Sequence, residues 1–234
     1  MTARWLLPLL VTLLPACGQT LAEGPVAAAA APGSSVDLAQ TTRVTFPGEP
    51  SRRTERLVVG GHDVLVGGAT YEEPGARRPY EHHGIPLRLT AVVMKFDAPA
   101  FPTLGERESA ALVATIRAAF AGFGKVVDLA PVAGPGGLPS FQLSLDRPNA
   151  WSLLRRSHVR TVVRIVVGRT SLSFLAARFD PWNVLDESQG VEAFDALLAS
   201  SSFADRAPEP QDDHGGASPN VDGAALETLV SLLD

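Results

Sequence analysis

The apolar positions in the first half of the chain predict strands. Residues 43–46 alternate between polar and apolar side chains, and Pro47-Gly48 ends the run. Two β-branched runs, 57–59 and 64–66, flank a glycine pair, which is the signal of a β-hairpin. A longer apolar run follows at 87–96. We therefore expect four strands before the first helix.

A helical period first appears beyond residue 103. Thr103 and Glu106 have the spacing of a capping box, in which each side chain binds the other residue's free backbone amide. Apolar residues then recur at steps of four, four and three, which places them on one face of a helix. They are Leu112, Ile116, Phe120 and Phe123. This spacing predicts a helix that ends near the glycines at 122 and 124.

Strand patterns return after this helix. They cover 126–129, 141–145, 159–167 and 171–178. Gly168-Arg169-Thr170 separates the last two runs, which predicts a tight hairpin. Four apolar residues then predict a second helix, which ends at the serine run 200–202: Val191, Phe194, Leu197 and Leu198. Many strands with few helices indicate an α+β fold, an antiparallel sheet with helices packed on it.

Two short motifs, taken with this order of elements, resemble a known family. Phe46-Pro47-Gly48-Glu49-Pro50 lies near the start, and Phe194-x-x-Leu197 with Ser202-Phe203 lies near the end. Together they resemble the PsbP-like fold, an α/β/α sandwich found in a photosystem extrinsic subunit, a Ran-binding import factor and DcrB-type envelope lipoproteins. The resemblance covers residues 41–203. It implies a binding or assembly module, and it implies no catalytic residues.

The N-terminus predicts an exported precursor. Residues 1–4 carry one positive charge and no acid, residues 5–14 are mostly apolar, and a small residue, Ala16, precedes Cys17. This order is typical of a signal peptide, here covering residues 1–16. The apolar run is too short to span a bilayer, because a spanning helix needs about 20 residues.

Cys17 is the only cysteine of the chain, so no internal disulfide can form. Leu14-Pro15-Ala16-Cys17 resembles the lipobox of bacterial lipoproteins, in which the cysteine is diacylated and becomes the first mature residue. The resemblance implies a protein of the bacterial cell envelope that is held to a membrane by lipid on Cys17. An ordinary secreted protein is the alternative.

Composition predicts a flexible segment on each side of the domain. Residues 17–40 are rich in Ala, Gly, Pro and Ser, which is typical of a tether. Residues 204–234 contain seven acids and one base, and we expect this tail to be disordered. Residues 17–203 balance eighteen acids against eighteen bases. This neutral core argues against a dedicated nucleic-acid binder, which needs a net basic face.

Six arginines and no acid lie between residues 147 and 169. Five of them are candidate contacts for an anionic partner: Arg155, Arg156, Arg160, Arg164 and Arg169. Arg160 and Arg164 are four apart on a predicted strand, so they share a face. A local cluster of this kind suits an anionic lipid headgroup, a polyanion, an acidic protein or the chain's own acidic tail. The alternative is that these arginines pair with acids on neighbouring strands.

The extreme C-terminus predicts a short amphipathic helix. Its apolar positions have the spacing of one helix face: Leu226, Leu229, Val230 and Leu233. A helix of about three turns is unstable alone in water, so it needs a partner surface. That surface is either the protein's own domain or a groove on another protein.

Groups that could carry catalysis or bind metal are sparse. Tyr80-Glu81-His82-His83 offers two adjacent histidines, which point in different directions and do not close a metal site. The chain contains no nucleophile elbow and no zincin helix. We therefore expect no cofactor, no metal and no enzymatic activity. The alternative is a secreted or anchored hydrolase whose triad is assembled from scattered residues.

Overall fold

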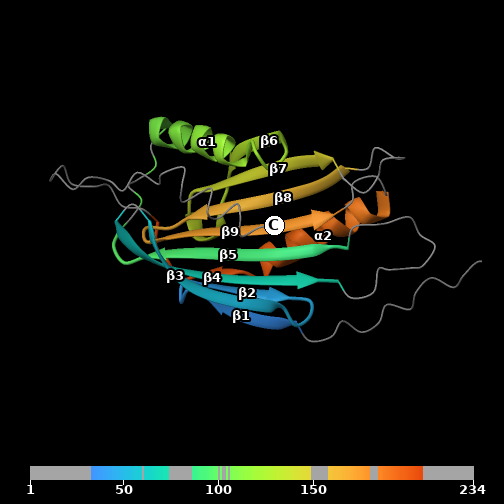
Figure 1. Ribbon diagram of the computed structural model, residues 1–234, viewed down its shortest axis with the longest axis horizontal. Coiled ribbons are helices and arrows are strands. Elements are labelled where there is room, and N and C mark those ends of the chain that lie inside the picture. The colour runs from blue at the N-terminus through green and yellow to red at the C-terminus, as the bar shows by residue number, and fades with distance from the viewer. Residues whose placement is uncertain are drawn as a thin grey trace, which may run out of the picture. The chain divides into compact units, whose positions relative to one another are not determined.

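The computed structural model describes residues 33–59, 61–73, 86–99, 101, 104, 106–148, 158–179 and 184–207 (Figure 1). The strands are β1 (Ser34–Leu38), β2 (Thr42–Phe46), β3 (Ser51–Val59), β4 (His62–Glu72), β5 (Arg88–Phe96), β6 (Lys125–Val132), β7 (Ser140–Pro148), β8 (His158–Val167), β9 (Ser171–Phe179) and β10 (Ser202–Phe203). The helices are α1 (Glu106–Phe120) and α2 (Val184–Ala199). The expected α+β class is confirmed in this coarse form, since the described residues form mainly antiparallel sheet.

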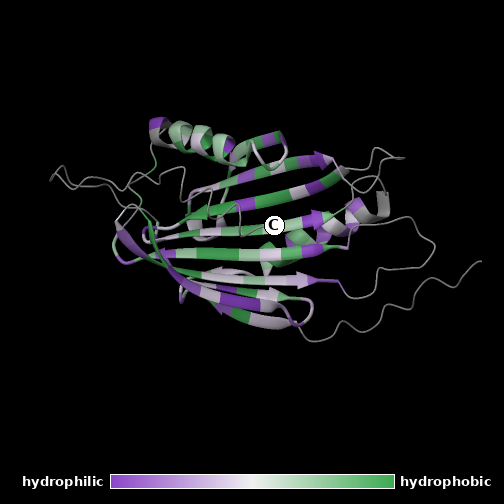
Figure 2. Ribbon diagram, viewed as in Figure 1, coloured by the Kyte–Doolittle hydropathy of each residue, from purple (hydrophilic) through white to green (hydrophobic). Residues whose placement is uncertain are grey.

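Within the described part of the chain, seven strands form one sheet in the order β3-β4-β5-β9-β8-β7-β6. Every neighbouring pair is antiparallel. Apolar residues dominate β5 and β8 in the middle of the sheet (Figure 2). Nearly every residue of β5 and of β9 is buried. These strands lose water from both faces, which explains why their apolar residues run on without polar alternation.

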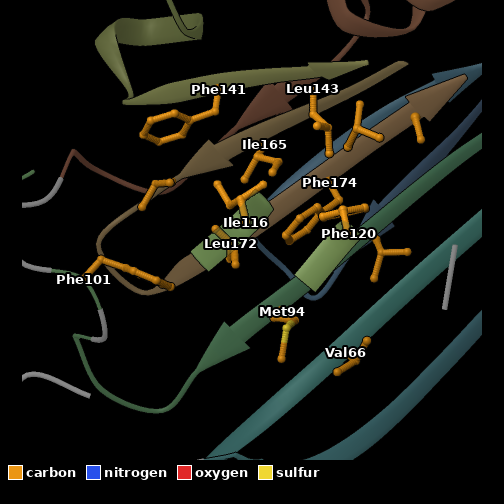
Figure 3. Close-up of a cluster of buried hydrophobic side chains, with 14 of the residues drawn as sticks. Val66, Met94, Phe101, Ile116, Phe120, Phe141, Leu143, Ile165, Leu172 and Phe174 are labelled. Carbon is orange, nitrogen blue, oxygen red and sulfur yellow. The ribbon is translucent and has the colours of Figure 1, made fainter. Parts of the chain in front are cut away.

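The helices pack on opposite faces of this sheet. Ile116 and Phe120 of α1 are fully buried against side chains from β4, β5, β7, β8 and β9 (Figure 3). Phe194 and Leu197 of α2 belong to a second cluster on the other face. Burying an apolar face on the sheet stabilises each helix, because most of the stability of a helix in a protein comes from such packing.

A smaller sheet of three strands, in the order β1-β2-β10, shares the face of α2. Val44 and Phe46 of β2 are fully buried there. The turn between β1 and β2 lies on β4, where a Cβ on Gly67 would come within 2.7 Å of the Ala39 amide nitrogen. Ala39 and Gln40 form this turn with positive φ angles of 47° and 63°.

Two boundaries predicted from composition are wrong. Residues 34–38, inside the predicted tether 17–40, form β1, and Val36 and Leu38 are buried. Residues 204–206, inside the predicted disordered tail, hydrogen-bond to the domain. Short segments with few apolar residues can still be ordered when a neighbouring strand completes their hydrogen bonds.

All eight predicted strands and both predicted helices are present in the expected order. The hairpins at 60–61 and 168–170 are confirmed. Val191, one of the four residues that predicted the second helix, lies in α2 but is 43% exposed. Thr103, the predicted capping residue, lies outside the described residues.

The two ends of the large sheet hold different parts of the chain. Ser34, where β1 begins, pairs with Phe46 and donates a hydrogen bond to Glu49. We call this the tether end. Phe203 and the segment after it lie at the other end, beside Thr42 and the β8–β9 turn, which we call the hairpin end. The chain therefore enters the described domain at one end of the sheet and leaves it at the other.

Candidate functional site

Arg160, one of the five arginines predicted to contact an anionic partner, links β8 to two carboxylates. Its Nε donates to Asp146 Oδ1 on β7 at 3.0 Å, and its Nη1 donates to Glu187 Oε1 on α2 at 2.5 Å. The Arg160 side chain is 30% exposed. The hydrogen bond to Asp146 raises the pKa of Arg160, and both carboxylates add to this by charge attraction. Arg160 therefore joins helix to sheet.

Arg164 is the next arginine on the same face, and its contacts are to neutral groups. Nη2 donates to Gln142 Oε1 at 2.6 Å, and Nη1 donates to the Ala133 carbonyl at 3.3 Å. Its Nε is buried and has no hydrogen-bond partner among the described residues. Burial lowers the pKa of Arg164, while the charge of Asp195 on α2 acts in the opposite direction. This guanidinium is held inward under α2.

The pairing alternative therefore holds for Arg160, and the expectation that it offers a free cation to an anionic partner is wrong. Arg164 is likewise turned toward the protein. Arg169 contributes its backbone amide to the Arg206 carbonyl at 2.8 Å. Arg155 and Arg156 lie outside the described residues.

The amino-acid composition did not predict that Asp205, at the start of the tail, is bound at the hairpin end. Asp205 Oδ2 accepts hydrogen bonds from the Thr170 amide at 2.9 Å, the Thr170 hydroxyl at 3.2 Å and the Ser171 hydroxyl at 2.7 Å. Gly168 begins this hairpin because a Cβ there would collide with the Asp205 carboxylate. The β8–β9 turn is thus built around a carboxylate from the start of the tail.

Further polar contacts surround this anchor. The Thr42 and Ser173 hydroxyls lie 3.0 Å apart and are buried, which ties β2 to β9. The Ala204 amide donates to the Thr41 carbonyl at 2.8 Å. Lys95 Nζ donates to Gln40 Oε1 at 3.3 Å, across from the small sheet to β5. These contacts hold the N-terminal hairpin and the C-terminal segment on the large sheet together.

The chemistry of this cluster is structural. The Ser171 hydroxyl donates to a carboxylate, which leaves it without the imidazole that would act as its general base. His62 Nδ1 lies 3.4 Å from Asp97 Oδ1 instead. Among the described residues, no group of three or more His, Cys, Asp or Glu side chains is gathered as a metal site. Tyr80-Glu81-His82-His83 lies outside the described residues, and the hydrolase alternative stays an untested prediction.

The exposed surface of strand β3 was likewise not predicted from the sequence. It runs for nine residues in unbroken register with β4, and it is the terminal strand of the large sheet. Its first six residues are all exposed, and Val58 is 72% exposed. Only 57–59 has an apolar strand pattern, because an exposed edge carries polar residues on both faces.

The remaining predicted sites lie outside the described residues. They are Cys17 and the C-terminal helix positions Leu226, Leu229, Val230 and Leu233. Neither described helix has the length and apolar character needed to cross a membrane. No protein-family model matches the chain, and no curated protein matches it in sequence.

Proposed function

We propose that the chain is a lipid-anchored binding or assembly module of the bacterial cell envelope, with a PsbP-like domain. The signal peptide predicted for residues 1–16 and the lipobox ending at Cys17 support export and anchoring. The packing of α1 and α2 on opposite faces of an antiparallel sheet supports the PsbP-like α/β/α sandwich.

The exposed edge of β3 is the observation that carries the binding role. An edge strand has a row of backbone donors and acceptors without partners in its own sheet, and such a row binds extended segments. Nine residues exceed the common length of a strand, which is five or six. The edge therefore has the length needed for a specific interaction through the backbone.

The path of the chain suits an anchored module. Residues 17–32 would span at most about 50 Å when extended, and they join the domain at the tether end. A lipid on Cys17 would keep this end within that distance of the membrane.

Replacing Cys17 by Ser tests the anchor. The variant should move from the membrane fraction to the soluble fraction, because one hydroxyl cannot accept the thioether-linked lipid. Thr20→Ser is the matched control, since it changes a nearby polar residue and leaves the cysteine in place. If the Cys17→Ser protein stays with membranes in high salt, the proposed lipid anchor is wrong.

A further inference from the structure

The open side of β3 presents a defined set of backbone groups. Val59 pairs with His62 across a two-residue turn, so these two residues form the hydrogen-bonded pair next to the turn. Backbone groups alternate in direction along a strand, so Val59 and every second residue before it point toward β4, and the residues between them point away from β4. The outward residues are Arg52, Thr54, Arg56 and Val58. Their side chains share one sheet face, because side chains alternate with the same period.

This outward row carries two arginines and no acid. Arg56 is exposed, and none of the ion pairs between described residues involves it. Arg52 Nη2 lies 3.3 Å from Glu49 Oε1, but both side chains are at least half exposed. An exposed pair of this kind is weak and can exchange for another carboxylate. The row can thus accept two carboxylates spaced four residues apart.

The opposite edge of the sheet is closed to such binding. Strand β6 contains Pro131, which lacks a backbone donor, and its register with β7 shifts between Val126 and Asp128. Proline and bulges are devices that keep an edge strand from pairing. Strand β3 has neither in its nine residues. Of the two edges of the large sheet, only β3 is continuous.

A second copy of the chain is a poor occupant of this edge. In an antiparallel pair, the backbone groups of two directly opposed residues either both point toward the partner strand or both point away from it. Two copies of β3 can therefore pair only in registers that differ by an even number of residues. The register that overlaps all nine residues places Glu55 opposite Glu55 of the second copy. The two registers that overlap seven residues place Arg52 opposite Arg56, or Arg56 opposite Arg56. Each long register therefore opposes like charges, which disfavours it.

We propose that β3 binds an extended acidic segment of a partner protein by antiparallel strand addition. The segment has carboxylates opposite Arg52 and Arg56, a hydroxyl side chain opposite Thr54 and an apolar residue opposite Val58. Backbone hydrogen bonds provide the affinity, and the two charge pairs fix the register. This inference rests on the proposed binding role and names the chemistry of the partner.

A short peptide of the sequence VVDTTTD has this pattern when it runs antiparallel to β3. Its first valine lies opposite Val58 and its two aspartates lie opposite Arg56 and Arg52. Fluorescence anisotropy of the labelled peptide with the full chain should show saturable binding that weakens with salt. The control peptide VVKTTTK should bind about tenfold more weakly or not at all, because it opposes like charges.

Two variants of β3 separate strand addition from general charge attraction. Arg56→Pro removes an outward N–H but no hydrogen bond to β4, and it should weaken VVDTTTD at least about tenfold. Arg56→Glu alters only an exposed side chain, and it should abolish the preference for VVDTTTD, because each peptide then has one opposite-charge pair and one like-charge pair with β3. Arg117→Ala, which removes an exposed arginine from α1, should leave both affinities unchanged.

Amide hydrogen exchange identifies the occupant. In the free full chain, the amides of Arg52, Thr54, Arg56 and Val58 should exchange rapidly, and VVDTTTD should slow all four. Slow exchange of these amides before peptide is added would mean that the chain itself covers the edge, and this would overturn the proposal. Binding that Arg56→Glu leaves unchanged would overturn it as well. Neither result depends on Cys17, so failure here is distinct from failure of the membrane anchor.

Discussion

The anchor formed by Asp205 gives the sharpest test of how far the ordered domain extends. Composition assigns this residue to a disordered tail, whereas its carboxylate accepts three hydrogen bonds from Thr170 and Ser171. Asp205→Ala would remove all three. The Ser171 hydroxyl is almost fully buried, so the variant would leave it without its acceptor.

The size of the effect follows from these contacts. A hydrogen bond to a charged acceptor contributes about 1.5–3 kcal/mol, and a buried hydroxyl left without a partner costs about 1–3 kcal/mol. Asp205 itself is only partly buried, so water would replace some of the lost interaction. We therefore expect Asp205→Ala to lower the free energy of unfolding by about 2–3 kcal/mol. This corresponds to a fall in Tm of roughly 4–12 °C.

Urea unfolding of the full chain measures this loss directly, provided that the m-value stays constant. Asp63→Ala is the matched control, because Asp63 is an exposed acid at the same end of the sheet. It should change the free energy of unfolding by no more than about 0.5 kcal/mol. If Asp205→Ala is as stable as this control, segment 204–206 is not fastened to the hairpin, and the ordered domain ends before residue 204.

Three further changes test other parts of the structure. Gly67→Ala should destabilise the domain by about 1–3 kcal/mol in urea unfolding, because its Cβ would collide with the β1–β2 turn, while Gly122→Ala, with open space around it, should be neutral. Arg160→Ala should cost about 1–2 kcal/mol, since it leaves two carboxylates unpaired; an equal loss for Arg160→Lys would argue against the two-carboxylate geometry. Burial raises the pKa of Tyr71, so the folded state favours the protonated phenol and loses stability as the pH rises above about 10. Tyr71→Phe should remove this alkaline loss in unfolding curves measured across that range, and an unchanged pH profile would contradict the assignment.

Local patterns predicted the regular elements well because most of them are amphipathic or wholly buried. The face formed by Leu112, Ile116, Phe120 and Phe123 packs on the sheet as its spacing indicates. Strand β1 was missed because Ser34–Leu38 has only two large apolar residues, and its pairing with β2 decides its structure. Val191 lies in α2, the helix that it helped to predict, but its side chain is 43% exposed and adds nothing to the buried face.

The contacts of the charged residues could not be predicted in the same way. Arg160 finds its carboxylates 14 and 27 residues away, and only the order of strands brings them together. A count of charges within one segment therefore overstated the free positive charge. Asp205 reaches Ser171 across 34 residues for the same reason. The charged residues of an exposed edge strand such as β3 do not alternate with apolar residues, so the sequence contains no strand pattern there. The exposed surface of β3 could be identified only from the order of strands in the sheet.

The central claim is that the chain matures to an exported lipoprotein that begins at Cys17. Intact-mass analysis of the protein extracted from membranes of cells that express the full chain tests it most directly. The account predicts a protein that lacks residues 1–16 and carries a diacylglyceryl group on Cys17. A mature protein with an unmodified cysteine, or one that begins at another residue, would contradict the lipid anchor on which the proposed function depends.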